Sequence, residues 1–250
     1  MPLEEDGTKL RWDSVYRKLG EGYARYRPND QLVESLRRHL SDTPKPRVLE
    51  VGVGKGNESL VIAAAGAAVV GLDYSRAALA LLDRRSSGQG STLELVEADA
   101  RVLPFQDGAF DLVFSQGVLE HFRDPTSALR EQRRVLRPGG VIVVEVPNKF
   151  TAYTVAKRLL MWVGRWAPGW ETEYSPRQLH RLLSGAGFDV IDTRGWDFLL
   201  LRAIRKIRRR LGFTDSPPLR VATAIRRRLE TNPLVVNVCL SLVMAARKPG

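Results

Sequence analysis

Three glycines at alternate positions, Gly52, Gly54 and Gly56, follow a short apolar run that reads as a strand and precede a run that reads as a helix. Glycine lets the main chain turn sharply and lets a ligand approach it without a Cβ in the way. The amides at the start of the following helix favour a negative group on that ligand. A dinucleotide-binding loop would need glycine at position 57, where this chain has Asn57. The loop alone leaves two interpretations open, a ligand-binding loop and a tight turn.

Two carboxylates favour the ligand-binding interpretation. Asp73 ends the second predicted strand, about where a Rossmann unit places the acid that accepts hydrogen bonds from a ribose diol. Asp99 ends the third predicted strand, within reach of an adenine amine on the same side of the sheet. One acid at a strand end is commonly just solvated or a helix cap. Two acids at successive strand ends beside a glycine loop are harder to explain in that way.

The elements that would position these residues alternate between strand and helix from residue 47 onward, which predicts a parallel, doubly wound α/β sheet. Helix starts are marked by Ser75, by Asp124-Pro125 and by a capping box from Ser175 to Gln178. No helix of ordinary crossover length lies between the last two strands, so we expect them to pair antiparallel. The predicted fold is a Rossmann-like, seven-stranded, mostly parallel sheet with an antiparallel last strand and helical additions. Its predicted strands are residues 47–51, 69–72, 93–97, 111–115, 141–146, 188–193 and 237–245, after a helical stretch at 10–40.

Several short motifs follow one another between about residues 45 and 195. They are, in order, Val48 to Gly56, Asp73, Glu97-Ala98-Asp99, Leu103-Pro104-Phe105, Phe110 to Val113, Val118 to His121, Asp124-Pro125 and Leu136 to Gly140. In this order they resemble the class I S-adenosylmethionine (SAM)-dependent methyltransferases, and in particular the group that includes the ubiquinone and menaquinone methyltransferases. The resemblance implies an enzyme that uses SAM as its cofactor.

The resemblance also implies which residues bind SAM. Glu50 and the three loop glycines would hold the methionine moiety. Asp73 would lie at the ribose, Asp99 with Ala100 would lie at the adenine, and Tyr74 would also bind the cofactor. SAM has no pyrophosphate, which fits a loop that lacks the third glycine of the dinucleotide pattern.

A sulfonium methyl group is already activated, so the main tasks of such an enzyme are in-line positioning and exclusion of water. His121 is the candidate general base, because a neutral imidazole suits proton removal at about pH 7; a structural histidine is the alternative. Gln116 would close over the cofactor after the fourth strand. Glu120-His121 also resembles a metal-binding pair of some relatives, but the upstream acid expected there is Gln116 in this chain, so no metal is expected.

Two segments decorate the core on the expected acceptor side. The first, residues 151–174, is rich in apolar and aromatic side chains and is expected to form a lid. The second is a basic helical insertion at residues 197–233. Within it, residues 198–229 hold ten basic side chains and a single acid, and so carry +9 of the chain's net charge of +11. From Phe198 to Leu211 the helical spacing places an apolar stripe on one side and arginines on the opposite side, a composition typical of a helix in a membrane interface. A solvated surface helix and a nucleic-acid-binding helix are the alternatives.

Composition bounds the remaining expectations. The 250 residues suit one α/β domain, divided here into an N-terminal helical cap and linker (1–46) and a methyltransferase domain (47–250). Cys239 is the single cysteine, so no intramolecular disulfide can form, and the N-terminus has no signal-peptide pattern. We expect a cytoplasmic protein, with the inner face of the membrane as a further location. The expected function is methyl transfer from SAM to a small, lipophilic acceptor; an RNA methyltransferase and a SAM-binding scaffold without turnover are the alternatives.

Overall fold

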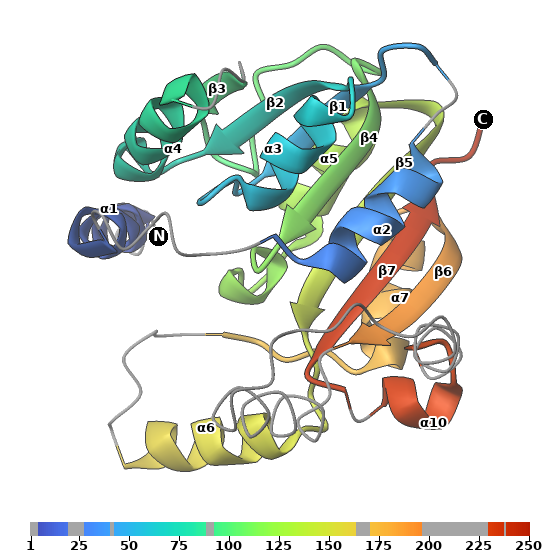
Figure 1. The fold of residues 1–250 in the computed structure, drawn as a ribbon. Helices are drawn as coiled ribbons and strands as arrows, with labels where there is room; N and C mark the ends of the chain where they lie inside the picture. Colours follow the sequence, from blue (N-terminus) through green and yellow to red (C-terminus); the bar gives the residue numbers. More distant parts are fainter. Residues whose placement is uncertain are drawn as a thin grey trace, which may run out of the picture.

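The computed structural model of the protein describes residues 5–19, 28–40, 43–88, 93–163, 171–196, 230–237 and 239–250. Seven strands form one sheet in the order β3-β2-β1-β4-β5-β7-β6 (Figure 1). The first five pair in parallel, and β7 lies antiparallel between β5 and β6, as the sequence predicted. The strands are β1 (Arg47–Val51), β2 (Ala68–Asp73), β3 (Glu94–Glu97), β4 (Phe110–Gln116), β5 (Leu136–Pro147), β6 (Asp189–Trp196) and β7 (Ser241–Arg247).

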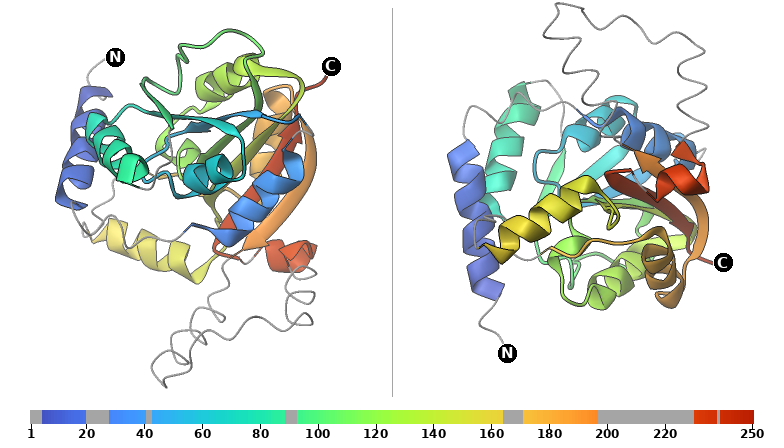
Figure 2. Two further views of the ribbon diagram at one scale, coloured as in Figure 1. Left: turned by 45° about the horizontal axis from the view of Figure 1, so that its top comes forward. Right: turned by 90° about the horizontal axis from the view of Figure 1, so that it is seen from below.

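Helices cover both faces of this sheet (Figures 1 and 2). Val48 and Leu49 are adjacent in β1, project to opposite faces and are both fully buried. Val48 packs with residues of α2 and α3, and Leu49 packs with residues of α5 and α7. A sheet buried on both sides in this way is a doubly wound sheet. The helices are α1 (Glu5–Leu19), α2 (Asp30–His39), α3 (Asn57–Ala64), α4 (Arg76–Gly88), α5 (Thr126–Val135), α6 (Ala152–Trp162), α7 (Pro176–Gly185) and α10 (Pro233–Val236), with a 3-10 turn, η3 (Leu119–His121).

Two helix starts follow the predicted chemistry. The Ala78 amide donates to the Ser75 hydroxyl at 3.2 Å, so Ser75 caps α4. Ser175 and Gln178 form both hydrogen bonds of a capping box at the start of α7. The third start is shifted by one residue. Helix α5 begins at Thr126, whose amide donates to Asp124 at 3.0 Å, so Pro125 takes the cap position instead of the first helical position.

The ends of three strands, β5, β6 and β7, differ from the prediction by three or more residues. β5 begins at Leu136 instead of residue 141, because the Gly139 amide donates to the carbonyl of Lys248 and the Lys248 amide donates to that of Gly140. The C-terminal end of the chain therefore extends the ladder across the Pro-Gly-Gly sequence. β6 runs to Trp196 instead of 193, since its register with β7 continues to Ser241.

The last strand also starts later than predicted. β7 begins at Ser241 instead of residue 237, and Cys239 precedes it instead of lying within it. The thiol of Cys239 is buried and donates to the carbonyls of Val236 and Ser241. The predicted helical stretch at 10–40 contains two helices, α1 and α2, and Asn29 caps the second by accepting hydrogen bonds from two amides.

The basic segment at residues 198–211 lies outside the described residues. Within the ranges that the structure describes, no helix is both long enough and apolar enough to cross a membrane. Helices α1 and α6 lie at the side of the molecule where the parallel strands end (Figure 1). They are therefore placed to cover whatever binds at the carboxyl edge of the sheet.

Candidate cofactor and acceptor site

A central cavity of about 660 Å³ lies between α1 and the carboxyl ends of the parallel strands. Side chains from loops that are far apart in the sequence meet there, because parallel strands deliver their ends to one edge of the sheet. The predicted site residues that line the cavity are Gly52, Asp73, Tyr74, Asp99, Ala100, Gln116 and His121. Three others, Glu50, Gly54 and Gly56, lie close in sequence but outside its lining.

Glycine is required at the turn after β1. Gly52 has φ of +71° and Gly54 has φ of +44°, a region that side chains with a Cβ rarely adopt. A Cβ on Gly52 would collide with a methyl group of Val118, and one on Gly54 would collide with the hydroxyl of Tyr16. The loop is thus packed from one side by the segment after β4 and from the other side by α1.

The amides of this loop are engaged by the end of β2. The Gly52 and Val53 amides both donate to the carbonyl of Leu72, at 2.7 and 2.9 Å. The Gly54 amide donates to a carboxylate oxygen of Asp73 at 2.9 Å. These three amides are therefore not arranged to cradle a pyrophosphate, which a dinucleotide-binding loop must do.

Asp73 is buried at the boundary between the loop and the cavity. Its second oxygen accepts a hydrogen bond from the Ser75 amide at 2.9 Å. Burial raises the pKa of this carboxyl above its usual value, while the hydrogen bonds from Ser75 and Gly54 act in the opposite direction. The Tyr74 amide also acts on Asp73, so of the roughly four acceptor positions of a carboxylate about one remains for a hydroxyl group of a ligand in the cavity.

Asp99 lines the cavity but is already paired. Its two oxygens accept hydrogen bonds from the guanidinium of Arg101, one of them at 2.9 Å. A ligand amine would therefore have to share Asp99 with Arg101. The same guanidinium lies 5.9 Å from the centre of the Phe122 ring, so it links the two sides of the cavity wall.

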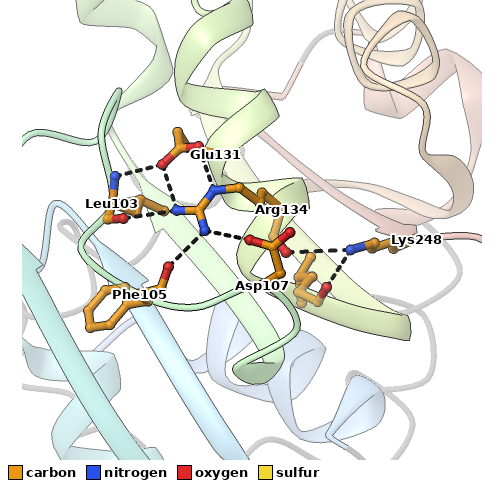
Figure 3. Close-up of polar contacts among 7 residues, drawn as sticks. Leu103, Phe105, Asp107, Glu131, Arg134 and Lys248 are labelled. Atoms are coloured by element: carbon orange, nitrogen blue, oxygen red, sulfur yellow. Dashed lines mark hydrogen bonds and ion pairs between the residues drawn. The ribbon is translucent and has the colours of Figure 1, made fainter.

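The loop that follows this wall is held in place by one arginine (Figure 3). Arg134 of α5 donates to the carbonyls of Leu103 and Phe105 at 2.9 and 2.7 Å, and to the carboxylates of Asp107 and Glu131. Glu131 in turn accepts from the Leu103 amide at 2.8 Å. This network fixes the chain just after the Asp99 wall and holds the Leu103-Pro-Phe105 motif beside the site.

Glu50 lies at the end of β1, beneath the loop. It is 2% exposed and accepts a hydrogen bond from the Ser59 hydroxyl. Burial raises its pKa well above the usual value, and the nearby charge of Glu58 raises it further. The structure thus brings Glu50 behind the loop and not into the cavity.

Three cavity residues come from a part of the chain where sequence reasoning assigned no site. Arg11, Trp12 and Tyr16 of α1 all line the cavity. The Trp12 ring meets the His121 ring edge-on, with centroids 5.1 Å apart. The sequence showed Trp12 only as an apolar position of a helix; nothing local in the sequence indicates that this helix lies over the carboxyl edge of the sheet.

Two buried glutamates adjoin the cavity wall, Glu120 next to His121 in the chain and Glu145 opposite Gln116 in the sheet. Burial raises the pKa of both Glu120 and Glu145 to about 8; the charge of Glu145 adds to the shift of Glu120, and that of Glu58 adds to the shift of Glu145. Glu145 accepts a hydrogen bond from the Gln116 side chain, which connects it to the cavity wall. In the described part of the chain, no three His, Cys, Asp or Glu side chains are grouped to hold a metal ion.

Helix α6 presents apolar side chains to solvent. Lys157, fully buried, holds one side of the helix by ion pairs of 2.8 Å to Glu171 and Glu173. The other side ends in an exposed group that we call the apolar tip of α6; it consists of Leu159, Met161, Trp162 and Val163, with Trp162 83% exposed. Helix α6 follows β5 and lies below the ends of the parallel strands in Figure 1, well apart from α1 in that view.

Comparison with known proteins decides the family. A methyltransferase domain model matches residues 49–144. The chain is 30% identical to the ubiquinone biosynthesis O-methyltransferase of Cereibacter sphaeroides over 177 residues, which cover 67% of this chain and 71% of that protein. It belongs to the class I SAM-dependent methyltransferases, in the group that includes the ubiquinone and menaquinone enzymes. A demethylmenaquinone methyltransferase of Thermus thermophilus is 41% identical over 111 residues, covering 43% of this chain and 50% of that enzyme.

Solved structures agree on the fold of this methyltransferase. The crystal structure of the [4+2]-cyclase SpnF superposes with a TM-score of 0.67 at 23% identity, covering 97% of this chain and 95% of that one. At this level of identity the likeness concerns the fold alone.

The cavity fits the cofactor of the family. SAM brings a ribose diol, an adenine and a methionine, and no phosphate. The loop matches this, since its amides are occupied, while the cavity wall offers the carboxylate of Asp73 and, shared with Arg101, that of Asp99. SAM is therefore the cofactor, and the enzyme transfers its methyl group.

Proposed function

We propose that this methyltransferase acts on a small, lipophilic acceptor of the quinone, lipid or isoprenoid class. The observation that carries the proposal is the apolar tip of α6, which is exposed on the helix that follows β5, at the side of the molecule where the parallel strands end. The names of the two bacterial relatives, which are quinone methyltransferases, support the same acceptor class.

In this proposal the loop at Gly52, Gly54 and Gly56, with Glu50 behind it, holds the methionine moiety of the cofactor. Asp73 and Tyr74 bind the ribose, and Asp99 with Ala100 lies at the adenine. Gln116 closes the wall after β4. The support is that seven of the ten predicted site residues line one cavity, and that the glycines are conformationally required there.

We further propose His121 as the general base. When bound, the cofactor supplies an activated methyl group on a sulfonium. The imidazole of His121 lines the cavity beside Trp12 and is placed to take a proton from an acceptor hydroxyl. Trp12 and Tyr16 belong to the cap (residues 1–46) and exclude water from the cavity of the methyltransferase domain (residues 47–250).

The acceptor class can be tested with methyl-labelled SAM. We expect label to enter the organic phase when the enzyme is incubated with a bacterial lipid extract, and not to enter total RNA. Gly52→Val, which fills the required glycine position, is the matched inactive control. Label found in RNA would replace this proposal by the RNA methyltransferase alternative, and SAM binding without any transfer would favour a scaffold.

The lipophilic acceptor would be reached at an anionic membrane surface on the cytoplasmic side. The basic stretch Phe198–Leu211 supports this by its composition, since each basic side chain near such a surface contributes about 1 kcal/mol. Changing Arg202, Arg205, Lys206 and Arg209 to Gln should abolish co-sedimentation with anionic liposomes and leave SAM binding intact. Membrane docking would be refuted if the parent protein does not bind the liposomes at low salt but retards RNA in a gel.

A further inference from the structure

A second hollow lies on the other side of α1 from the central cavity. This α1–α4 groove has a volume of about 670 Å³ and is walled by the facing sides of the two helices. Nothing in the proposed methyl transfer uses it, so a ligand bound there would be independent of the identity of the acceptor.

Helical spacing places its charged side chains on facing surfaces. On α1, Lys9, Asp13 and Arg17 are spaced by four residues and lie on one face. On α4, Arg76 and Arg84 are eight residues apart on the face that looks back at α1. The intervening residues that line the groove are small or apolar, namely Ala77, Ala80 and Leu81, whereas the acid between the arginines, Asp83, is not part of the lining. The groove therefore has cationic walls and an apolar floor.

The carboxylates in the groove are already committed. Glu97 accepts hydrogen bonds from Lys9 at 2.7 Å and from Arg76 at 2.8 Å, which fixes both cations in place. Asp13 accepts from the Ser75 hydroxyl at 2.6 Å and from the Ala77 amide. Four cations and two carboxylates leave the groove with a net charge of +2.

Two arginines of the groove have no such anion. Among the described residues, neither Arg17 nor Arg84 has an ion pair within 4.0 Å, although the charge of Arg17 acts on Asp13. Arginine forks bind the oxygens of a phosphate in pairs, and a phosphate monoester carries close to two negative charges at neutral pH. The net charge of +2 and the guanidinium donors of Arg17 and Arg84 therefore match a phosphate monoester.

The groove and the central cavity share a wall. Tyr16 lines both of them, and its hydroxyl lies over Gly54 of the cofactor loop. An anion that bridges Arg17 of α1 to Arg84 of α4 would hold α1 against the body of the enzyme. SAM, bound beside the loop that Tyr16 covers, and the anion would then both favour the state in which α1 is docked, so each would tighten the binding of the other by the same factor.

We propose that the α1–α4 groove binds a phosphate monoester and that this binding holds α1 closed over the cofactor. The test is calorimetric titration with SAM in the presence of glycerol 3-phosphate, or of phosphatidylcholine vesicles that contain phosphatidic acid. Sodium chloride at equal ionic strength is the reference. We expect at least about a fivefold tighter SAM affinity with the monoester than with chloride.

The matched variants are Arg17→Gln with Arg84→Gln, against Arg37→Gln, which removes an exposed arginine of α2. The double variant should lose the monoester effect and weaken monoester binding at least about tenfold, while Arg37→Gln keeps both. A thermal melt of each variant controls for folding. Enhancement by glycerol 3-phosphate assigns the site to a free ester, and enhancement by the vesicles alone assigns it to a lipid headgroup. No enhancement over chloride, or an equal enhancement in the double variant, would overturn the proposal.

Discussion

The carboxylate of Asp13 in α1 accepts a hydrogen bond of 2.6 Å from the hydroxyl of Ser75, the residue that caps α4. Ser75 also donates its amide to Asp73. A side chain of the N-terminal helix is thereby connected through a single residue to the proposed ribose acid.

This connection predicts a role for Asp13 in cofactor affinity. Asp13→Ala should lower the free energy that docks α1 by about 1 kcal/mol, because it removes the acceptor for the Ser75 hydroxyl and the Ala77 amide at the start of α4. With α1 less firmly docked, SAM binding should weaken by roughly fivefold. Asp13→Asn keeps one acceptor oxygen and should restore most of the affinity. Ser14→Ala, a neighbouring exposed position of α1, is the control. Calorimetry that finds the same SAM affinity in Asp13→Ala and the parent would separate α1 from the cofactor.

The ribose assignment can be tested at Asp73. Asp73→Ala should weaken SAM binding at least about tenfold, because a hydrogen bond to a charged acceptor contributes roughly 1.5–3 kcal/mol. The exposed Asp83→Ala on α4 should leave the affinity unchanged. An unchanged affinity in folded Asp73→Ala protein, measured by calorimetry, would rule out a ribose contact.

A base at His121 should affect the rate and not the affinity. His121→Ala should lower the maximal rate about 10²–10⁴-fold while SAM affinity stays nearly intact. His180→Ala, on the exposed side of α7, should have no effect. Initial rates at saturating substrates make the comparison. A rate within about threefold of the parent would leave His121 with the structural role that its contact with Trp12 also allows.

The buried Glu145 should make stability depend on pH. Burial, reinforced by the charge of Glu58, raises its pKa to about 8, whereas the usual value is 4.5. Between these values the folded state holds a proton that the unfolded state has lost, so stability should be full at low pH and fall as the pH rises to about 8. Glu120, with a pKa of about 8, adds to the same trend.

Glu145→Gln mimics the protonated side chain and should therefore reduce this pH dependence. Thermal melts from about pH 5 to about pH 9 would measure it, with the exposed Glu94→Gln as control. A melting temperature that falls with pH as steeply in Glu145→Gln as in the parent would show that Glu145 is not the source of the dependence.

Local signals in the sequence were enough for the parallel core. The caps at Ser75 and Ser175 depend on contacts within a few residues, and β1 and the glycine turn are marked by their own residue types, so these patterns were readable. The start of β5 was not readable, because it depends on pairing of Gly139 and Gly140 with Lys248, more than a hundred residues away.

The candidate site was predictable for the same reason and to the same extent. Glycines and acids at strand ends converge because the topology requires it, and Asp73 and Gly52 line one cavity; their contacts with the cofactor stay a prediction. The side of the cavity formed by α1 was missed, since the docking of Trp12 and Tyr16 depends on long-range packing that has no local pattern. The pairing of Asp99 with Arg101 was missed too, although the two residues are only two apart.

The most direct test of the cofactor site is a pair of calorimetric titrations, one with SAM and one with NADH, on the parent and on Gly52→Val. A valine at a position with φ of +71°, against Val118, should remove SAM binding from a protein that still folds. We expect the parent to bind SAM and to show no binding of NADH, because the loop amides are not free to bind a pyrophosphate. NADH binding tighter than SAM in the parent, or an unchanged SAM affinity in folded Gly52→Val, would contradict a SAM site at this loop.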